Sequence, residues 1–465
     1  MMAQSSRRKV DFVKKDIISE LPQNLQEIIL CFLPIRDAVR TSALSRAWRY
    51  RWTRIPHLIF DLESIFHSTM KKYTENDDPG LKAYSFVSVI NKVLLLHKGP
   101  ILKFSLDIPQ GYKFDTQIVH DYIDQWISLL SKNGTKQLTL DNYNNLLEES
   151  NAHNFSVLDL THLRLLSVWF PYTPSYERFA NLTHLELVDA TYSFGQSIFF
   201  CPVLEKLTLI ICRGLFPNNF CAPNLKCLIQ VYHKLSSKYS LAGLENLEEY
   251  SLMLLEDCSE EMQTFNVVII PGSLHKIEKF SLADDSLKVL AAGGFPHKLS
   301  KPLPYLKSLN IFDIDFGVLC EASCLVSLIR SAPNLRKLHI SVSHLLLTHS
   351  NSCNGGKDKL EEYQIEDSED CTMLHLEIVL FSDFKGFVAE LELVKFLLAC
   401  SPSLKSLFIH RRCSIKDCAS ALKITEEMLQ YTRASSRAQI RHLESPVKFN
   451  DNCFDWKLLS AYDLY

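Results

Sequence analysis

The sequence of 465 residues predicts an α/β fold, an irregular solenoid of short repeats preceded by a small three-helix module. Two observations lead to this expectation. Residues 16–61 carry the apolar spacing of short helices, and most of the remaining chain repeats the phrase apolar-x-x-apolar-x-apolar. One such repeat cannot bury its own apolar face, so neighbouring repeats must stack to build a core.

The first element we expect is a helix that opens at Leu21-Pro22 and ends before Pro34. A proline suits a first helical turn, because its missing N–H would have had no partner there. The apolar side chains that follow Leu21 fall within an arc of about 140° on one helix face. They are Leu25, Ile28, Ile29, Phe32 and Leu33.

Two further helical stretches complete this block. Residues 35–44 are expected to bury Val39 and Leu44, and residues 46–54 form a third helix after an N-cap at Ser45. The third stretch carries Trp48 and Trp52, four residues apart. Domains of about forty residues rarely enclose a stable core alone. The block is therefore either a helical cap on the repeats or a docking module whose apolar face another protein completes.

The block ISELPQNLQEIILCFLPIRDAVRTSALSRAWRYRW resembles the F-box of plant F-box proteins. Four features carry the resemblance: Leu21-Pro22, Leu33-Pro34, the run at 36–42 and the Leu-Ser-x-x-Trp at 44–48. One departure is Arg46-Ala47-Trp48, where many relatives have a second basic residue before the tryptophan. The resemblance implies a three-helix module that binds a Skp-family adaptor and, through it, a cullin-based ubiquitin ligase. The adaptor-binding residues that it suggests are Leu21, Pro22, Leu25, Ile28, Ile29, Leu33, Pro34, Val39, Leu44 and Trp48.

The charge of this block differs from that of the whole chain. Residues 36–54 hold six arginines and one aspartate, whereas the chain has a formal net charge of −3. Such a stretch is usually a solvated surface, and it would also suit an acidic partner.

The repeats follow a turn-rich linker, residues 62–80, and a helix within residues 86–97. The apolar phrase starts at Ile101, Leu163, Leu182, Leu204, Leu247, Ile277, Leu306, Leu335, Met373 and Leu404, with shortened or imperfect copies at Leu138 and Leu225. This is the signature of leucine-rich repeats, each of which contributes one short strand. The longer repeats have room for a helix, for example at 122–130 and 325–329, and the shortest have room only for a turn. Cys212 stands where the repeat consensus expects Asn or Cys; most other repeats lack that residue, so a distorted solenoid is expected.

The residues between the buried positions of the strands are expected to line one exposed face. The side chains proposed there to bind a target protein are Trp169, His184, Glu186, Lys206, Glu249, Lys279, Asn310, Lys337, His339, His375 and Glu377. Their mixed charge suits a protein partner better than nucleic acid, which would require clustered Lys and Arg.

The C-terminal part of the chain resembles the FBD region of plant F-box proteins with leucine-rich repeats. The resemblance is carried by Cys371-Thr372, Phe384-x-Gly386, and the stretches 390–398, 401–407 and 433–440. We expect two more repeats there and a final helix at 426–431 that caps the repeats. Before this region, residues 348–370 are acidic and glycine-containing, as expected for a surface loop.

Several classes of protein are disfavoured by the sequence. The N-terminus has no apolar segment of a secretory signal, and no apolar run approaches the roughly 18 residues of a membrane span. The 14 cysteines lack zinc-site spacing, and neither a phosphate-binding loop nor a hydrolase or zinc-protease motif occurs. We therefore expect reduced thiols, a location in the cytoplasm, the nucleus or both, and no cofactor, no metal and no catalytic site.

These observations divide the chain into an N-terminal tail (1–15), an F-box (16–61), a linker (62–80), leucine-rich repeats (81–370), an FBD region (371–450) and a C-terminal tail (451–465). The function expected is that of the substrate-recognition subunit of a Skp-cullin-F-box ubiquitin ligase, which recruits a target protein through its repeats. The alternative is a repeat receptor or scaffold that acts outside a ubiquitin ligase.

Overall fold

The computed structural model of the chain is mixed α/β and divides into two compact units, Met1–Ser167 and Val168–Tyr465. It describes residues 18–61, 65, 79–108, 116–142, 158–170, 179–192, 199–233, 240–255, 274–292, 302–342, 373–411 and 418–443. The two expected tails (1–15 and 451–465), the acidic loop (348–370) and nearly all of the expected linker lie outside these residues.

The first unit begins with short helices: α1 (Gln23–Cys31), α2 (Ile35–Arg40) and the 3₁₀ helices η1 (Thr41–Ala43) and η2 (Arg51–Arg54). The expectation of a third α-helix over 46–54 is wrong, because residues 46–50 form turns and only 51–54 are helical. Burial of Leu44 is also wrong, since it is 72% exposed; Ile35 and Ala38 face inward from α2 instead.

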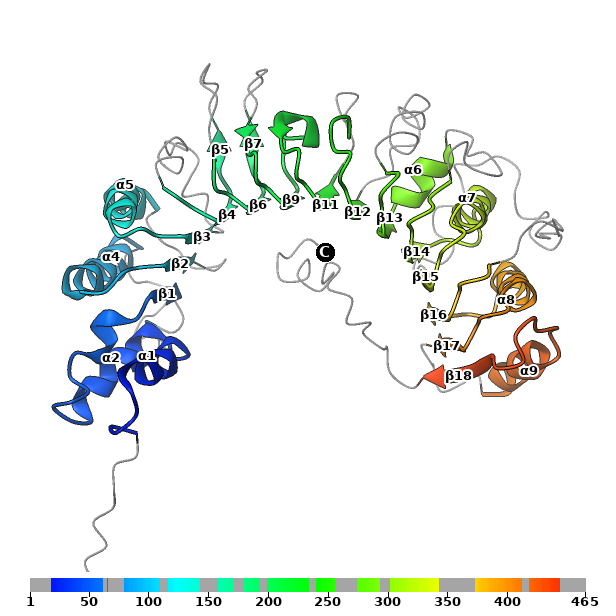
Figure 1. Cartoon of the computed structure of the whole chain (residues 1–465), viewed down its shortest axis with the longest axis horizontal. Helices are drawn as coiled ribbons and strands as arrows, with labels where there is room; N and C mark the ends of the chain where they lie inside the picture. Colours follow the sequence, from blue (N-terminus) through cyan, green and yellow to red (C-terminus); the bar gives the residue numbers. More distant parts are fainter. Residues whose placement is uncertain are drawn as a thin grey trace, which may run out of the picture. The chain divides into compact units, whose positions relative to one another are not determined.

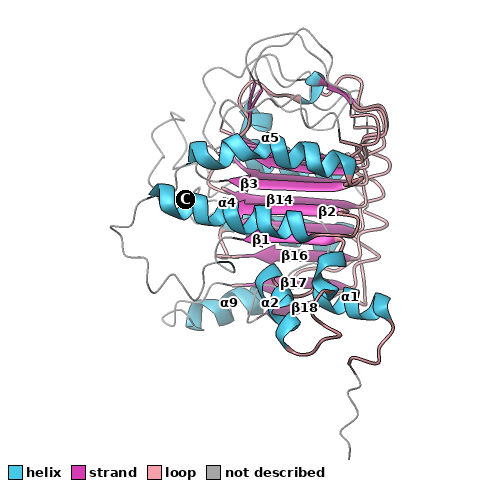
Figure 2. Ribbon diagram, turned by 90° about the vertical axis from the view of Figure 1, so that its left-hand side faces the viewer, coloured by secondary structure: helices cyan, strands magenta, loops and turns pink. Residues whose placement is uncertain are grey.

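Parallel strands follow these helices: β1 (His57–Asp61), β2 (Lys103–Ile108), β3 (Gln137–Asn142) and β4 (His162–Leu166), hydrogen-bonded in this order. Between them, α4 (Pro79–Leu96) and α5 (Thr116–Lys132) lie side by side (Figure 2). The indole Nε1 of Trp126 on α5 donates to Asn91 Oδ1 on α4 at 2.7 Å. The two helices therefore pack as one layer on these strands.

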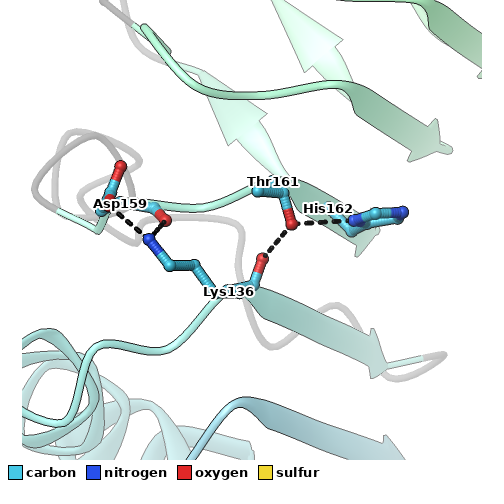
Figure 3. Close-up of polar contacts among 4 residues, drawn as sticks. All are labelled: Lys136, Asp159, Thr161 and His162. Carbon is cyan, nitrogen blue, oxygen red and sulfur yellow. Dashed lines mark hydrogen bonds and ion pairs between the residues drawn. The ribbon is translucent and has the colours of Figure 1, made fainter.

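The turns that precede β3 and β4 are linked by polar contacts, shown in Figure 3. The Lys136 ammonium contacts the Asp159 carboxylate and also donates to the Asp159 carbonyl at 3.3 Å. The Thr161 hydroxyl donates to the Lys136 carbonyl at 3.1 Å and lies 2.9 Å from Nδ1 of His162. These contacts hold successive repeats in register where each strand begins.

The second unit contains a longer parallel ladder, visible as adjacent strands in Figure 1. Its strands are, in hydrogen-bonded order, β6 (His184–Val188), β9 (Lys206–Ile210), β11 (Cys227–Tyr232), β12 (Glu249–Leu254), β13 (Lys279–Asp284), β14 (Ser308–Ile314), β15 (Lys337–Val342), β16 (Ile378–Ser382), β17 (Ser406–His410) and β18 (Gln439–Leu443). One row of buried side chains runs across the ladder and forms its core. It consists of Leu185, Leu207, Leu228, Tyr250, Phe280, Leu309, Leu338, Val379 and Leu407.

The length of each repeat determines whether an α-helix or a shorter element follows its strand. The longer repeats place α6 (Ser286–Ala292), α7 (Leu319–Arg330), α8 (Val388–Cys400) and α9 (Cys418–Leu429) on the same side of the ladder (Figure 1). The shorter repeats have the 3₁₀ helix η5 (Pro217–Asn219) and small paired strands, β5 (Trp169–Phe170) with β7 (Thr191–Tyr192) and β8 (Phe199–Phe200) with β10 (Phe220–Cys221). The final helix is α9, which is longer and begins earlier than the expected 426–431, and β18 follows it.

Several residues at or next to the ends of strands have a left-handed backbone. Asp189, Asp284, Asp313 and Asp383 have φ values of 48° to 58°, and Ile211 has a φ of 53°. Aspartate tolerates this region better than most residues, whereas a β-branched isoleucine is unusual there. Next to Ile211, the buried Cys212 thiol donates to the Leu187 carbonyl at 3.4 Å, and burial raises its pKa to about 12. The thiol therefore stays protonated and links neighbouring repeats.

Candidate docking surface

Helix α1 has one buried side and one exposed apolar side. Gln26 and Leu30 face inward, and α1 contacts η2 while α2 contacts η1 and β1. The opposite side presents large apolar side chains to solvent. They are Leu25, Ile28, Ile29, Phe32 and Leu33, with exposed fractions from 37% for Leu33 to 83% for Phe32. We call these five residues, together with the exposed Leu44, the apolar face.

The buried Gln26 and Trp48 fix the orientation of this helix. The Gln26 amide Nε2 donates to the carbonyls of Leu21 and Ser19 at 2.8 and 3.1 Å. The Trp48 indole Nε1 donates to Ser19 Oγ at 2.8 Å. Both polar groups are satisfied inside the module, so the segment before α1 is anchored while the apolar face remains outside.

The residues expected to bind an adaptor therefore divide into three groups. Six belong to or border the exposed surface: Pro22, Leu25, Ile28, Ile29, Leu33 and Pro34. Leu44 is also exposed, and Leu21 and Val39 are half-buried. Trp48, at 5% exposed, belongs to the interior and is not brought to this surface. The expected set omitted Phe32, although the same helical periodicity includes it.

Contiguous apolar patches on the surface of a protein are often binding sites. The apolar face is therefore a candidate interface with another protein. Pro34 separates α1 from α2, with an extended backbone conformation at φ −50° and ψ 143°. The exposed Phe32 and Leu33 stand at this corner. The arrangement can bind a complementary apolar protein surface.

The second expected site is the strand face of the second unit. Register places His184, Lys206, Glu249 and Lys279 in one row, with Cys227 between Lys206 and Glu249. The row continues to Lys337 through Ser308. A second row contains Glu186, Asn310 and His339. The strands therefore align most of these residues as the sequence pattern predicts.

Four members of the expected set differ from the prediction in position, and one of them, Glu377, directly precedes β16. Asn310 is buried, because its amide donates to Ser281 Oγ on the neighbouring strand at 3.1 Å. Trp169 lies in the short strand β5, outside the ladder. His375 is exposed but precedes β16 and is not part of a strand.

Charges on this face are partly neutralised between repeats. The Lys279 ammonium lies 2.7 Å from the Glu249 carboxylate, and Lys405 lies 2.5 Å from Glu377. Exposed ion pairs of this type contribute little to stability, but they reduce the net charge offered to a partner. His339 Nε2 lies 2.9 Å from Ser382 Oγ, and desolvation by burial lowers the His339 pKa to about 4. Its ring is therefore neutral at pH 7.

Within the described ranges, no group of three or more His, Cys, Asp or Glu side chains is arranged to hold a metal ion. No helix in that part of the chain has the length and apolar character of a membrane span.

Comparison with known proteins identifies three regions. The F-box domain family matches residues 18–59, which contain the apolar face. A family of leucine-rich repeats described as "FBD-associated F-box protein At5g56370, LRR repeats" matches residues 123–340, and the FBD family matches residues 370–409.

Relatives from Arabidopsis thaliana align along most of the chain. The F-box/FBD/LRR-repeat protein At1g13570 is 33% identical over 443 residues, which cover 92% of this chain and 99% of the relative. The F-box protein At3g59000 and the F-box/FBD/LRR-repeat protein At4g00160 are each 26% identical, over 85% and 83% of this chain and 86% and 84% of their own lengths. The chain belongs to the plant family of F-box proteins with leucine-rich repeats and an FBD region.

Proposed function

We propose that this protein is the substrate-recognition subunit of a Skp-cullin-F-box ubiquitin ligase. F-box proteins generally act as substrate receptors of such ligases and typically bind Skp-family adaptors, which link them to a cullin. The observation that supports this role most directly is the apolar face of α1, which leaves Ile28 and Phe32 at 51% and 83% exposed. Burial of such side chains by an adaptor would provide a large part of the binding free energy.

In this proposal, the repeats form a solenoid that holds a target protein, and the F-box holds the adaptor. The mechanism is proximity, because confining target lysines near an activated ubiquitin replaces a bimolecular encounter with a nearly unimolecular one. Proteins of this class are usually non-catalytic, and we propose that this chain also contributes no catalytic residue. We further propose that it acts in the cytoplasm, the nucleus or both.

The binding test compares the full-length chain with an Ile28→Asp variant on an immobilised, purified Skp-family adaptor. Ile28 is exposed in the free protein, so the carboxylate stays hydrated and folding is not expected to suffer. Loss of one buried large apolar side chain is worth about 1.5–3 kcal/mol, or roughly a 10- to 100-fold weaker Kd.

Leu95→Asp is the matched control. Leu95 is 83% exposed on α4, in the same unit but outside the F-box, and its replacement should leave Kd unchanged. Failure of the folded wild-type chain to bind the adaptor would contradict the ligase proposal. The alternative, a repeat receptor or scaffold outside a ligase, would then account better for the chain.

A further inference from the structure

The F-box carries exposed arginines that no acidic side chain of the described residues neutralises. Within the described residues, the exposed Arg46, Arg49 and Arg54 form no side-chain hydrogen bond or ion pair. The one aspartate of residues 36–54, Asp37, instead lies 3.3 Å from Arg40. We call Arg46 and Arg49, which flank the buried Trp48 in the sequence, the arginine rim.

The rim closely follows one member of the apolar face in the chain, and its turn is anchored by hydrogen bonds. Leu44, at 72% exposed, precedes Arg46 by two residues. The Ser42 hydroxyl donates to the Arg49 carbonyl at 2.8 Å, and the Trp48 amide donates to the Ser45 carbonyl at 3.2 Å. Because Trp48 is buried between the two arginines, the turn that carries them is anchored to the module interior.

Unpaired guanidinium groups next to an apolar surface favour a partner with acidic groups beside an apolar socket. A nucleic acid would offer phosphates but no surface to cover Leu44 and the apolar side of α1, and the chain as a whole has a formal net charge of −3. A protein surface with acidic groups beside an apolar socket would complement both the arginine rim and the apolar face. Charge complementarity of this type acts mainly on the rate of association.

We propose that the arginine rim binds an acidic patch on the same adaptor that covers the apolar face, and that it steers the adaptor onto that face. This inference rests on the proposed function. It assigns separate roles to two neighbouring surfaces: the apolar face sets the lifetime of the complex, and the rim sets the association rate and its dependence on salt. Steering of this kind weakens at high ionic strength, because exposed charges are then screened.

The test measures association and dissociation rates of the full-length chain on a purified Skp-family adaptor at about 50 mM and about 500 mM salt. Arg46→Glu combined with Arg49→Glu should slow association about tenfold at low salt, with little change at high salt. Arg46→Gln combined with Arg49→Gln should give a smaller effect in the same direction. Lys423→Glu combined with Arg437→Glu is the control, since both side chains are exposed and the charge change is the same.

The outcomes separate this inference from the proposed function. If wild-type chain binds but the rim variants associate like the charge control, the steering role is wrong and the ligase role stands. If the glutamate variant loses binding equally at both salt concentrations, the arginines do not act by steering. If folded wild-type chain binds at neither salt concentration, the proposed function fails, and the inference fails with it.

Discussion

Glu321 shows how one buried group can make stability depend on pH. It lies in the first turn of α7, 5% exposed, and its Oε2 accepts from the Asp315 backbone N–H at 3.0 Å. Burial, helped by the nearby Asp315 and Asp285 carboxylates, raises the Glu321 pKa to about 7, against the lowering effects of the Asp315 N–H and of Lys288. Between about pH 4.5 and about pH 7, Glu321 therefore keeps a proton in the folded protein that it has lost in the unfolded chain.

We predict that the Glu321 contribution reduces the free energy of unfolding as the pH rises from about 4.5 to about 7, and is constant above that. The full effect is about 3 kcal/mol, since each pKa unit corresponds to about 1.4 kcal/mol. Glu321→Gln keeps the amide contact and removes the charge, so it should stabilise the protein at about pH 8 and be nearly neutral at about pH 4. Urea denaturation at both pH values, with the exposed Glu426→Gln as control, measures the difference. An equal effect of Glu321→Gln at both pH values would contradict the prediction.

At the scale of single residues, the sequence predicts which side chains share a helix face as long as the helix continues. Periodicity places Ile28, Ile29 and Phe32 together, and the structure leaves all three exposed. It fails for Leu44 and Trp48, because turns interrupt the helix between them and change the direction of the side chains. Asn310 was also beyond prediction, since its partner Ser281 comes from another repeat.

At the scale of elements, the F-box is joined directly to the first repeat. Strand β1 follows η2 and pairs with β2, and the Lys98 and Gly99 amides donate to the Thr53 carbonyl at 2.8 and 3.2 Å. The sequence indicated the apolar phrase of β2 but not β1, because a lone strand of five residues at the end of helices has no repeat pattern of its own. The helices of the longer repeats were predictable, because their length leaves room for them.

We predict that Gly99→Ala destabilises this junction. A Cβ at Gly99 would lie 2.9 Å from the Arg54 carbonyl oxygen and 3.0 Å from the Arg54 Cα, so backbone must move to accept it. Overpacking of this kind typically costs about 1–3 kcal/mol. Hydrogen exchange of β1 and β2 should become faster in Gly99→Ala, while Lys92→Ala, at an exposed position on α4, should leave it unchanged. Unchanged hydrogen-exchange protection of β1 and β2 in Gly99→Ala would contradict this prediction.

At the scale of the whole molecule, each repeat is expected to stabilise the repeats next to it. Leu338 is 1% exposed and sits in register with Leu309 on β14 and Val379 on β16. A repeat contacts mainly its neighbours, so damage to one core position should spread along the ladder and weaken with distance. The regular apolar phrase predicted this ladder, whereas its last described strand, β18, lacks the phrase.

Leu338→Asp tests this expectation. A buried, unpaired carboxylate should unfold the repeat around β15, because an isolated ionised group is strongly disfavoured in an apolar core. Hydrogen exchange should then show loss of protection in β14, β15 and β16, with smaller losses in β13 and β17. Lys337→Ala is the matched control, since the neighbouring side chain faces away from the core and its loss should affect protection little. Loss confined to β15 would show that each repeat holds its own structure, and uniform loss through the unit would show that the ladder unfolds as one cooperative body.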